Sequence, residues 1–164
     1  DALKPYVESG KVKIVFDVYV EEWSSDNAYY IMKEYLRLSS NDIPDVILTS
    51  YDGLGYAARQ ALDEAGVTKD VIITGQDAEP KAIRYIIQGK QTLTIYKPLK
   101  PLAENAVITA VKLVHGEKPD TTTSIFNNRI RVPSLLFEPI AVDKNNIRET
   151  VVKDGMIKES DVGL

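Results

Sequence analysis

The sequence predicts an α/β protein built around a parallel, doubly wound sheet. Short runs rich in β-branched and aromatic residues alternate with segments whose apolar residues recur at helical spacing. The connections between these segments are short, and glycine or proline marks most of them. Because such an alternation packs helices against the faces of a parallel sheet, these observations together favour a doubly wound fold.

The first two-thirds of the chain supply the alternating elements. In chain order, strands are predicted at residues 11–20, 45–50, 70–74 and 92–97. Helices are predicted at residues 27–38, 56–66, 80–89 and 102–116. The third strand, DVIIT, is almost continuously apolar, which predicts burial on both of its faces.

Residues that cap or break helices mark the predicted ends. Ser25 and Asp26 can cap the first helix, and Gly66 can end the second. Pro80 suits the first turn of the third helix. The tail differs from the rest, because residues 121–147 read as extended pieces and residues 147–155 as a short closing helix.

Composition excludes several classes of function. The net charge is −4 and there is no run of basic residues, so no nucleic-acid partner is expected. The sequence has no cysteine, which removes disulfides and thiolate metal sites. His115 is the only histidine, and its place near a helix end is enough to explain it. Serine-histidine-aspartate catalysis and histidine-based zinc sites are therefore set aside.

Chemically useful side chains gather where the predicted strands end. Ligands of parallel sheets bind at the carboxyl ends of the strands. These ends carry Trp23, Tyr51, Gln76, Asp77 and Lys97. Carboxylate, amide and ammonium groups can hold neighbouring sugar hydroxyls, and an aromatic face packs against the C–H face of a sugar ring. A neutral polyol therefore fits this set of residues.

Other interpretations of the same residues stand beside this one. No phosphate-binding loop or dinucleotide fingerprint occurs. A metal site at Asp52 and Asp77 is conceivable, but nothing marks the further oxygen ligands it needs, so no metal or cofactor is expected. Asp77 can also be a simple helix cap, Trp23 a packing residue, and Lys97 a solvated surface residue.

Several blocks of the sequence resemble one known family. The block ITGQDAEPKAIRYIIQGKQTLTIYKPLKPLAENA is similar to the carboxyl-terminal half of the D-xylose-binding proteins of bacterial ABC transport. These are type I periplasmic sugar-binding proteins. The likeness continues through VPSLLFEPIAVDKNNIRETVVKDGMIKES and reaches back through LKPYVESGKVKIV and EEWSSDNA. It covers nearly the whole chain.

The resemblance implies roles for single residues in a two-lobed clamp that closes on one monosaccharide. By the match in EEW, Trp23 resembles the tryptophan that stacks on the sugar. By the matches in GQDA and YKP, Asp77 resembles the hydroxyl-binding carboxylate and Lys97 the hinge lysine that also touches sugar. Tyr51 departs from the family, which has asparagine there, and a phenol lacks the paired donor and acceptor of an amide.

The resemblance also implies that the clamp is incomplete in this chain. Residues 1–96 are expected to form most of the carboxyl-terminal lobe, without its first strand. Residues 97–130 are expected to cross to the amino-terminal lobe, and residues 131–164 to cross back and close the chain. An amino-terminal half of the same protein is thus an expected partner, and the chain is not expected to fold well alone.

Three functions remain open on these grounds. The first is an extracytoplasmic solute-binding protein, not an enzyme, that binds an aldopentose, D-xylose before others, by closure of two lobes and delivers it to an ABC permease. The second is a sugar-sensing subunit that signals to a membrane sensor histidine kinase, which the departure at Tyr51 favours slightly. The third is the effector domain of a transcriptional repressor, which shares the fold but fits the IYKP block and the tail less well.

Overall fold

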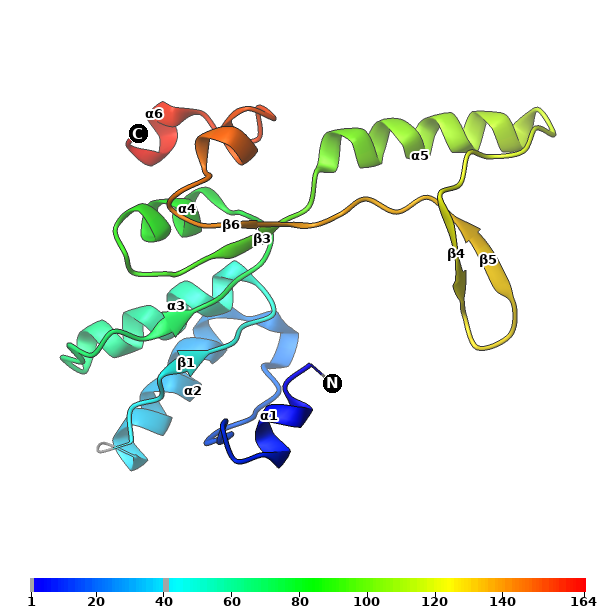
Figure 1. Ribbon diagram of the computed structural model, residues 1–164. Helices are drawn as coiled ribbons and strands as arrows, with labels where there is room; N and C mark the ends of the chain where they lie inside the picture. The colour runs from blue at the N-terminus through cyan, green and yellow to red at the C-terminus, as the bar shows by residue number, and fades with distance from the viewer. Residues whose placement is uncertain (1, 40–41) are drawn as a thin grey trace.

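The computed structural model of the chain describes residues 2–39 and 42–164 (Figure 1). The helices are α1 (Lys4–Glu8), α2 (Ser25–Leu38), α3 (Asp52–Glu64), α4 (Pro80–Ile87), α5 (Leu99–Val114) and α6 (Glu159–Val162), with a 3₁₀ turn η1 (Glu21–Trp23) and a π-helical turn η2 (Arg148–Val152). The strands are β1 (Val46–Ile47), β2 (Ile72–Ile73), β3 (Thr94–Tyr96), β4 (Thr123–Phe126), β5 (Arg131–Ser134) and β6 (Ile140–Val142).

The central strands run parallel, as predicted. β1 pairs with β2 in parallel, with Val46 opposite Ile72. A parallel bridge between Gln76 and Ile95 then brings β3 beside the end of β2. β6 joins on the far side of β3 in antiparallel register, with Tyr96 opposite Ile140. The α/β class with a parallel sheet is confirmed, and the antiparallel strand β6 is an addition that the alternation did not predict.

The strand predicted at residues 11–20 is wrong. Residues 12–20 form no strand, and β1 has β2 as its only ladder partner among the residues that the structure describes. β-branched composition makes a segment suitable for a strand, but a ladder also needs a neighbouring edge in register. The predicted burial of the third strand on both faces is half wrong: Ile73 is 0% exposed, whereas Ile72 is 48% exposed.

Two of the predicted helix caps are also wrong. The residue that caps α2 is Ser24, whose side-chain oxygen accepts a hydrogen bond from the Asn27 backbone N–H at 3.3 Å, so Ser25 and Asp26 lie inside the helix. Asp77 caps nothing, because the N-cap position of α4 is Glu79, two residues later. Its carboxylate pairs instead with Lys97.

Two buried clusters hold the body of the molecule together. The larger consists of residues from α4, β3, β6, η2 and α6, among them Ile83, Tyr96 and Val151. The second joins α2, α3 and β2 through residues such as Tyr35, Leu62 and Ile73. Because β1, β2 and β3 run in the same direction, the loops that follow them lie together at one edge of the sheet.

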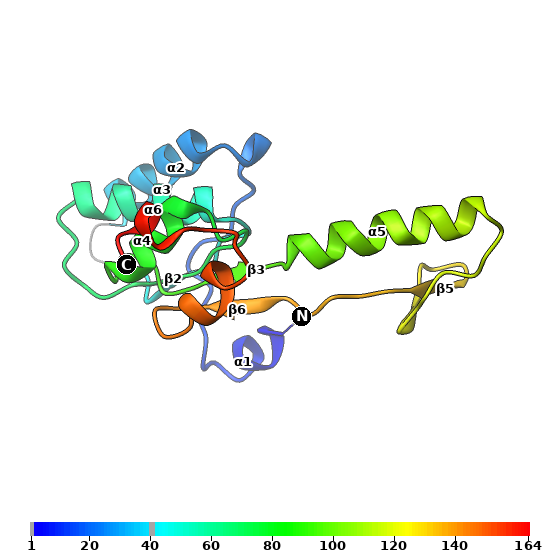
Figure 2. The ribbon, with the colours of Figure 1, turned by 90° about the horizontal axis from the view of Figure 1, so that it is seen from above.

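An arm made of α5, β4 and β5 extends away from this body (Figures 1 and 2). α5 contains no buried residue, and within the described ranges β4 and β5 pair only with each other, as an antiparallel hairpin. Val107, Ile108 and Val114 are 64%, 48% and 84% exposed. Among the described residues, no helix is both long and apolar enough to cross a membrane.

Candidate functional site

The ends of β2 and β3 bring two of the predicted residues into contact. Asp77 follows β2 and Lys97 follows β3, and Lys97 Nζ lies 2.6 Å from Asp77 Oδ1. The Asp77 backbone N–H donates to the Ile95 carbonyl at 2.9 Å, which fixes the two strand ends relative to each other. The side chains are 41% and 45% exposed, so both charged groups still face solvent. A carboxylate and an ammonium at this spacing can serve two neighbouring hydroxyls.

Trp23 and Tyr51 form a second pair, this time aromatic. Their ring centroids are 6.3 Å apart and the planes are inclined by 31°. Trp23 ends the η1 turn with a positive φ of 53° and is 49% exposed. Since the rings are too close to admit another ring between them, they form one continuous aromatic wall rather than a sandwich.

Tyr51 owes its position to a glycine. A Cβ built on Gly53 would lie 1.9 Å from the Tyr51 hydroxyl oxygen and 2.0 Å from Cζ. The phenol end of Tyr51 therefore lies directly over Gly53 in the first turn of α3. Any larger residue at position 53 has to push the ring away.

Gln76 links the two pairs. The side-chain N–H of Gln76 donates to the Ser50 carbonyl at 3.3 Å, and the backbone carbonyl of Gln76 accepts from the Asp52 backbone N–H at 2.9 Å. Ser50 and Asp52, on either side of Tyr51, are thereby hydrogen-bonded to Gln76, which precedes Asp77. The arrangement agrees with the sequence prediction that these strand ends share one edge.

Asp52 lies beneath this edge and is 0% exposed. Its carboxylate accepts three hydrogen bonds: from Gln91 Nε2 at 2.9 Å, from Thr94 Oγ1 at 3.0 Å and from the Glu79 backbone N–H at 2.9 Å. Burial raises the pKa of Asp52, and these hydrogen bonds oppose that effect. Because donors already surround both oxygens, Asp52 does not suit the metal site considered from the sequence.

Sequence reasoning missed Gln91 and Thr94 as partners in this network. Thr94 sits in an alternating strand and Gln91 in a loop, and neither position carries a motif. The signal in the sequence for this network was the position of Asp52, directly after a predicted strand and close to the start of a predicted helix. Among residues 2–39 and 42–164, no three His, Cys, Asp or Glu side chains gather as a metal site would require.

Two hollows lie near these residues. The smaller has a volume of about 290 Å³ and is lined by Gln76, Ile95, Lys97, Pro98, Leu102, Phe137 and Pro139. It lies at the point where the chain leaves β3 for the arm and returns before β6. A hollow with an ammonium, an amide and an aromatic ring in its lining suits a small polar ligand.

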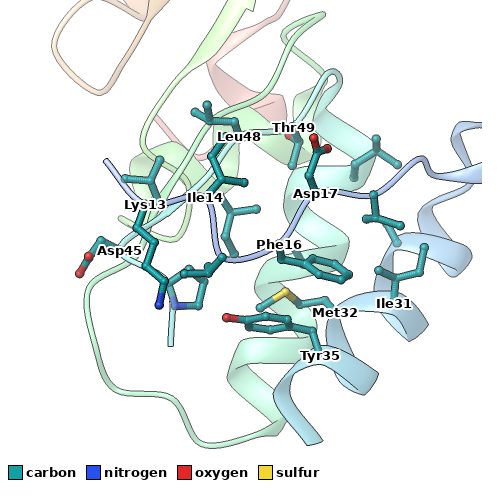
Figure 3. A pocket seen from close by; sticks show the side chains of 18 of the residues that line it. Lys13, Ile14, Phe16, Asp17, Ile31, Met32, Tyr35, Asp45, Leu48 and Thr49 are labelled. Atoms are coloured by element: carbon teal, nitrogen blue, oxygen red, sulfur yellow. The ribbon is translucent and has the colours of Figure 1, made fainter. Parts of the chain in front are cut away.

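The larger hollow, of about 1030 Å³, is mainly apolar (Figure 3). It lies between residues 12–20 on one side and α2 and β1 on the other, with Phe16 packed over Tyr35 at a centroid distance of 5.0 Å. Asp77 and Lys97 do not line it. Trp23 does line it, so the larger hollow borders the aromatic pair, whereas the candidate polar site of Asp77 and Lys97 lies at the strand ends.

Comparison with known proteins decides the family. A family model described as a periplasmic binding protein domain matches residues 1–118. The chain belongs to the periplasmic binding protein family. Its α/β body with strand ends gathered at one edge agrees with that assignment.

Two relatives of this periplasmic binding protein chain are D-xylose-binding periplasmic proteins. The one from Escherichia coli strain K12 is 45% identical over 160 residues, which cover 98% of this chain and 48% of that protein. The one from Haemophilus influenzae is 43% identical over 159 residues, covering 96% and 48%. The chain thus spans about half the length of the curated relatives it matches, and the predicted resemblance to their carboxyl-terminal half is confirmed.

A solved structure shows the same architecture. The crystal structure of an ABC transporter solute binding protein from Clostridium phytofermentans, with bound β-D-glucose, superposes with a TM-score of 0.85 at 26% identity. The match covers 98% of this chain and 52% of that one. The type I periplasmic-binding-protein fold, incomplete in this chain, is confirmed.

Proposed function

We propose that this chain forms the carboxyl-terminal half of an extracytoplasmic protein that binds an aldopentose, D-xylose before others, and delivers it to an ABC transporter. One observation carries the proposal: Asp77 and Lys97 meet at 2.6 Å at adjacent strand ends while each remains almost half exposed. The names of the relatives support it, since both are D-xylose-binding periplasmic proteins.

The chemistry of the four residues suits a sugar. An ionised carboxylate accepts through both oxygens and an ammonium donates three hydrogens, so Asp77 and Lys97 together satisfy hydroxyls that both donate and accept. Bonds to charged groups contribute more than bonds between neutral ones, about 1.5–3 kcal/mol each. The exposed ring of Trp23 offers an apolar surface to the C–H face of the sugar, and Tyr51 extends that surface.

We propose that residues 1–96 form most of one lobe, that residues 97–130 cross to a second lobe and that residues 131–164 return. The exposed apolar side chains of α5 support this, because a cluster of exposed apolar residues marks a surface that contacts another protein unit. β3 leads into the arm and β6 leads out of it, and the two strands lie side by side (Figure 1). Outgoing and returning segments that are adjacent can act together as a hinge.

Binding on this view is closure of two lobes around the sugar. Contacts from both lobes exist only in the closed state, so sugar shifts the population towards it. Lys97 and Pro98 stand where β3 ends and the arm begins, and both line the smaller hollow. We propose that no bond of the sugar is made or broken at this site.

The test is a titration of the complete two-lobed protein, this chain together with its amino-terminal half. Calorimetry is run with D-xylose, D-ribose, L-arabinose and D-glucose, and the sugar is recovered and examined by NMR. We expect D-xylose to bind most tightly and to be recovered unchanged. Binding of none of the four sugars would overturn the proposal, and a tighter fit for D-glucose would overturn the assignment to an aldopentose.

Delivery to a transporter needs a separate experiment. The sugar-loaded protein is immobilised and offered the ABC permease and, in a parallel reaction, the periplasmic portion of a sensor histidine kinase. We expect sugar-dependent capture of the permease. Capture of the sensor portion alone would replace transport with sensing, leaving the sugar site as proposed.

A further inference from the structure

The turn between β2 and α4 is held in an unfavourable backbone conformation. Asp77 and Ala78 have φ angles of 95° and 54°, and neither is glycine. Such conformations are unfavourable for residues other than glycine and persist only where the surroundings determine them strongly. Something around this turn must therefore hold it.

Three successive backbone N–H groups of the turn are tied to its surroundings. The Asp77 N–H donates to the Ile95 carbonyl at 2.9 Å, and the Ala78 N–H donates to Thr94 Oγ1 at 3.1 Å. The Glu79 N–H donates to Asp52 Oδ2 at 2.9 Å. The Thr94 hydroxyl itself donates to the same Asp52 oxygen at 3.0 Å. Two of these three backbone hydrogen bonds thus depend on the buried Asp52 carboxylate, one directly and one through Thr94.

The carboxylate is fixed in turn by its own neighbours. Gln91 Nε2 donates to Asp52 Oδ1 at 2.9 Å and to the Leu93 carbonyl at 3.1 Å, so the orientation of this amide is determined. A Cβ at Gly75 would lie 2.0 Å from Asp52 Oδ1 and 2.6 Å from Gln91 Nε2. Gly75 therefore leaves the space through which the carboxylate reaches the turn.

We propose that Asp52 and Thr94 act together as positioning residues of the sugar site: Asp52 orients the Thr94 hydroxyl, and Thr94 holds the Ala78 N–H of the turn at residues 77–79, so that the Asp77 carboxylate is aimed at Lys97 and at the sugar. Asp52 is fully buried and does not touch the sugar itself. This inference rests on the proposed function, in which Asp77 is the sugar-binding carboxylate. A purely structural role is the competing explanation, because any buried and satisfied carboxylate also stabilises the fold.

A double-mutant cycle separates the two roles, since coupling appears only between residues that act through each other. Thr94→Val removes both the donor to Asp52 and the acceptor for the Ala78 N–H, while Thr94→Ser keeps them. Both Thr94 substitutions are made in the complete two-lobed protein, once with Asp77 unchanged and once combined with Asp77→Ala. D-xylose affinity is measured by calorimetry in all of these proteins.

With Asp77 present, we expect Thr94→Val to weaken D-xylose binding about tenfold, as the loss of hydrogen bonds predicts, and Thr94→Ser to recover most of the affinity. In the Asp77→Ala background, we expect Thr94→Val to change the affinity less than about twofold. Equal losses in both backgrounds would overturn the positioning role. Unchanged affinity in Asp77→Ala alone would instead contradict the proposed function, so the two failures can be told apart.

A measurement on the unaltered protein covers the case in which Thr94→Val does not fold. Amide hydrogen exchange is followed at residues 77–79 without sugar. We expect the Ala78 and Glu79 amides to be as protected as the Asp77 amide, because all three have fixed acceptors. Exchange of Ala78 and Glu79 at the rate of a free loop would overturn the inference.

Discussion

Lys97 and Asp77 are joined by an ion pair of 2.6 Å, although Asp77 follows β2 and Lys97 follows β3, with helix α4 between the two strands in the chain. The pair is partly open to solvent on both sides, with 45% and 41% of the two side chains exposed. An ion pair of this kind contributes little to stability. The role we propose for this pair is therefore to bind sugar and not to stabilise the fold.

Replacing Asp77 by alanine tests that conclusion. The sugar loses a charged acceptor, so D-xylose affinity should fall by at least ~1.5 kcal/mol, while the melting temperature should change little. Calorimetry and a thermal melt of the complete protein measure the two quantities. Glu159→Ala is the matched control, because it breaks the similarly exposed pair with Arg148 at 2.6 Å and should leave affinity unchanged. A large drop in melting temperature for Asp77→Ala would assign the pair to folding instead.

Replacing Tyr51 by asparagine should change the affinity in the opposite direction. An amide supplies a donor and an acceptor side by side, which a phenol does not, so we expect D-xylose binding to strengthen about tenfold. The change also removes the contact with Trp23, whose centroid is 6.3 Å away. Tyr51→Phe is the control, since it keeps the ring and removes only the hydroxyl. Weaker binding in Tyr51→Asn would show that the aromatic wall contributes more than hydrogen bonding here.

Replacing Gly75 by alanine should destabilise the protein through crowding. The new Cβ would lie 2.0 Å from Asp52 Oδ1 in a fully buried network, so overpacking should cost about 1–3 kcal/mol in a urea unfolding curve. Gly53→Ala is the comparison. Its Cβ would meet the movable phenol end of Tyr51, so the ring can swing aside and the helix should gain up to ~1 kcal/mol. Equal effects of the two changes would contradict this account.

The pH dependence of stability should depend in part on Asp63. Partial burial tends to raise the pKa of Asp63, but hydrogen bonds from Arg59 and Lys90 outweigh it and hold the pKa below its usual value. An acid with a lowered folded pKa stabilises the protein above its unfolded pKa of about 4 and loses this contribution as pH falls through the folded pKa. The advantage of the wild type over Asp63→Asn should therefore be at most ~1 kcal/mol at neutral pH and vanish in acid.

Unfolding curves between neutral and acid pH measure that advantage. The same substitution made together with Arg59→Gln and Lys90→Gln serves as the control, because no cation then remains to favour the charged form at position 63. The difference in unfolding free energy between the triple variant and the double variant, which carries only Arg59→Gln and Lys90→Gln, should vary little with pH. An advantage of the wild type that grows in acid would contradict the sign of the shift.

The sequence was sufficient for much of the fold. Apolar periodicity, together with residues that begin or end helices, predicted α2, α3, α4 and α5. The parallel arrangement followed from the alternation of strands and helices. The strand at residues 11–20 failed for the converse reason: its residues suit a strand, but pairing depends on a neighbouring edge that composition cannot show.

The candidate site divides in the same way. The sequence by itself determined which polar and aromatic residues follow the strands, and the family that they resemble. Only the tertiary structure brought Asp77 within 2.6 Å of Lys97 and set Trp23 beside Tyr51. It alone also buried Asp52 among Gln91, Thr94 and Glu79. Contacts between residues far apart in the chain depend on packing and on the energy of burial, and no local pattern records them.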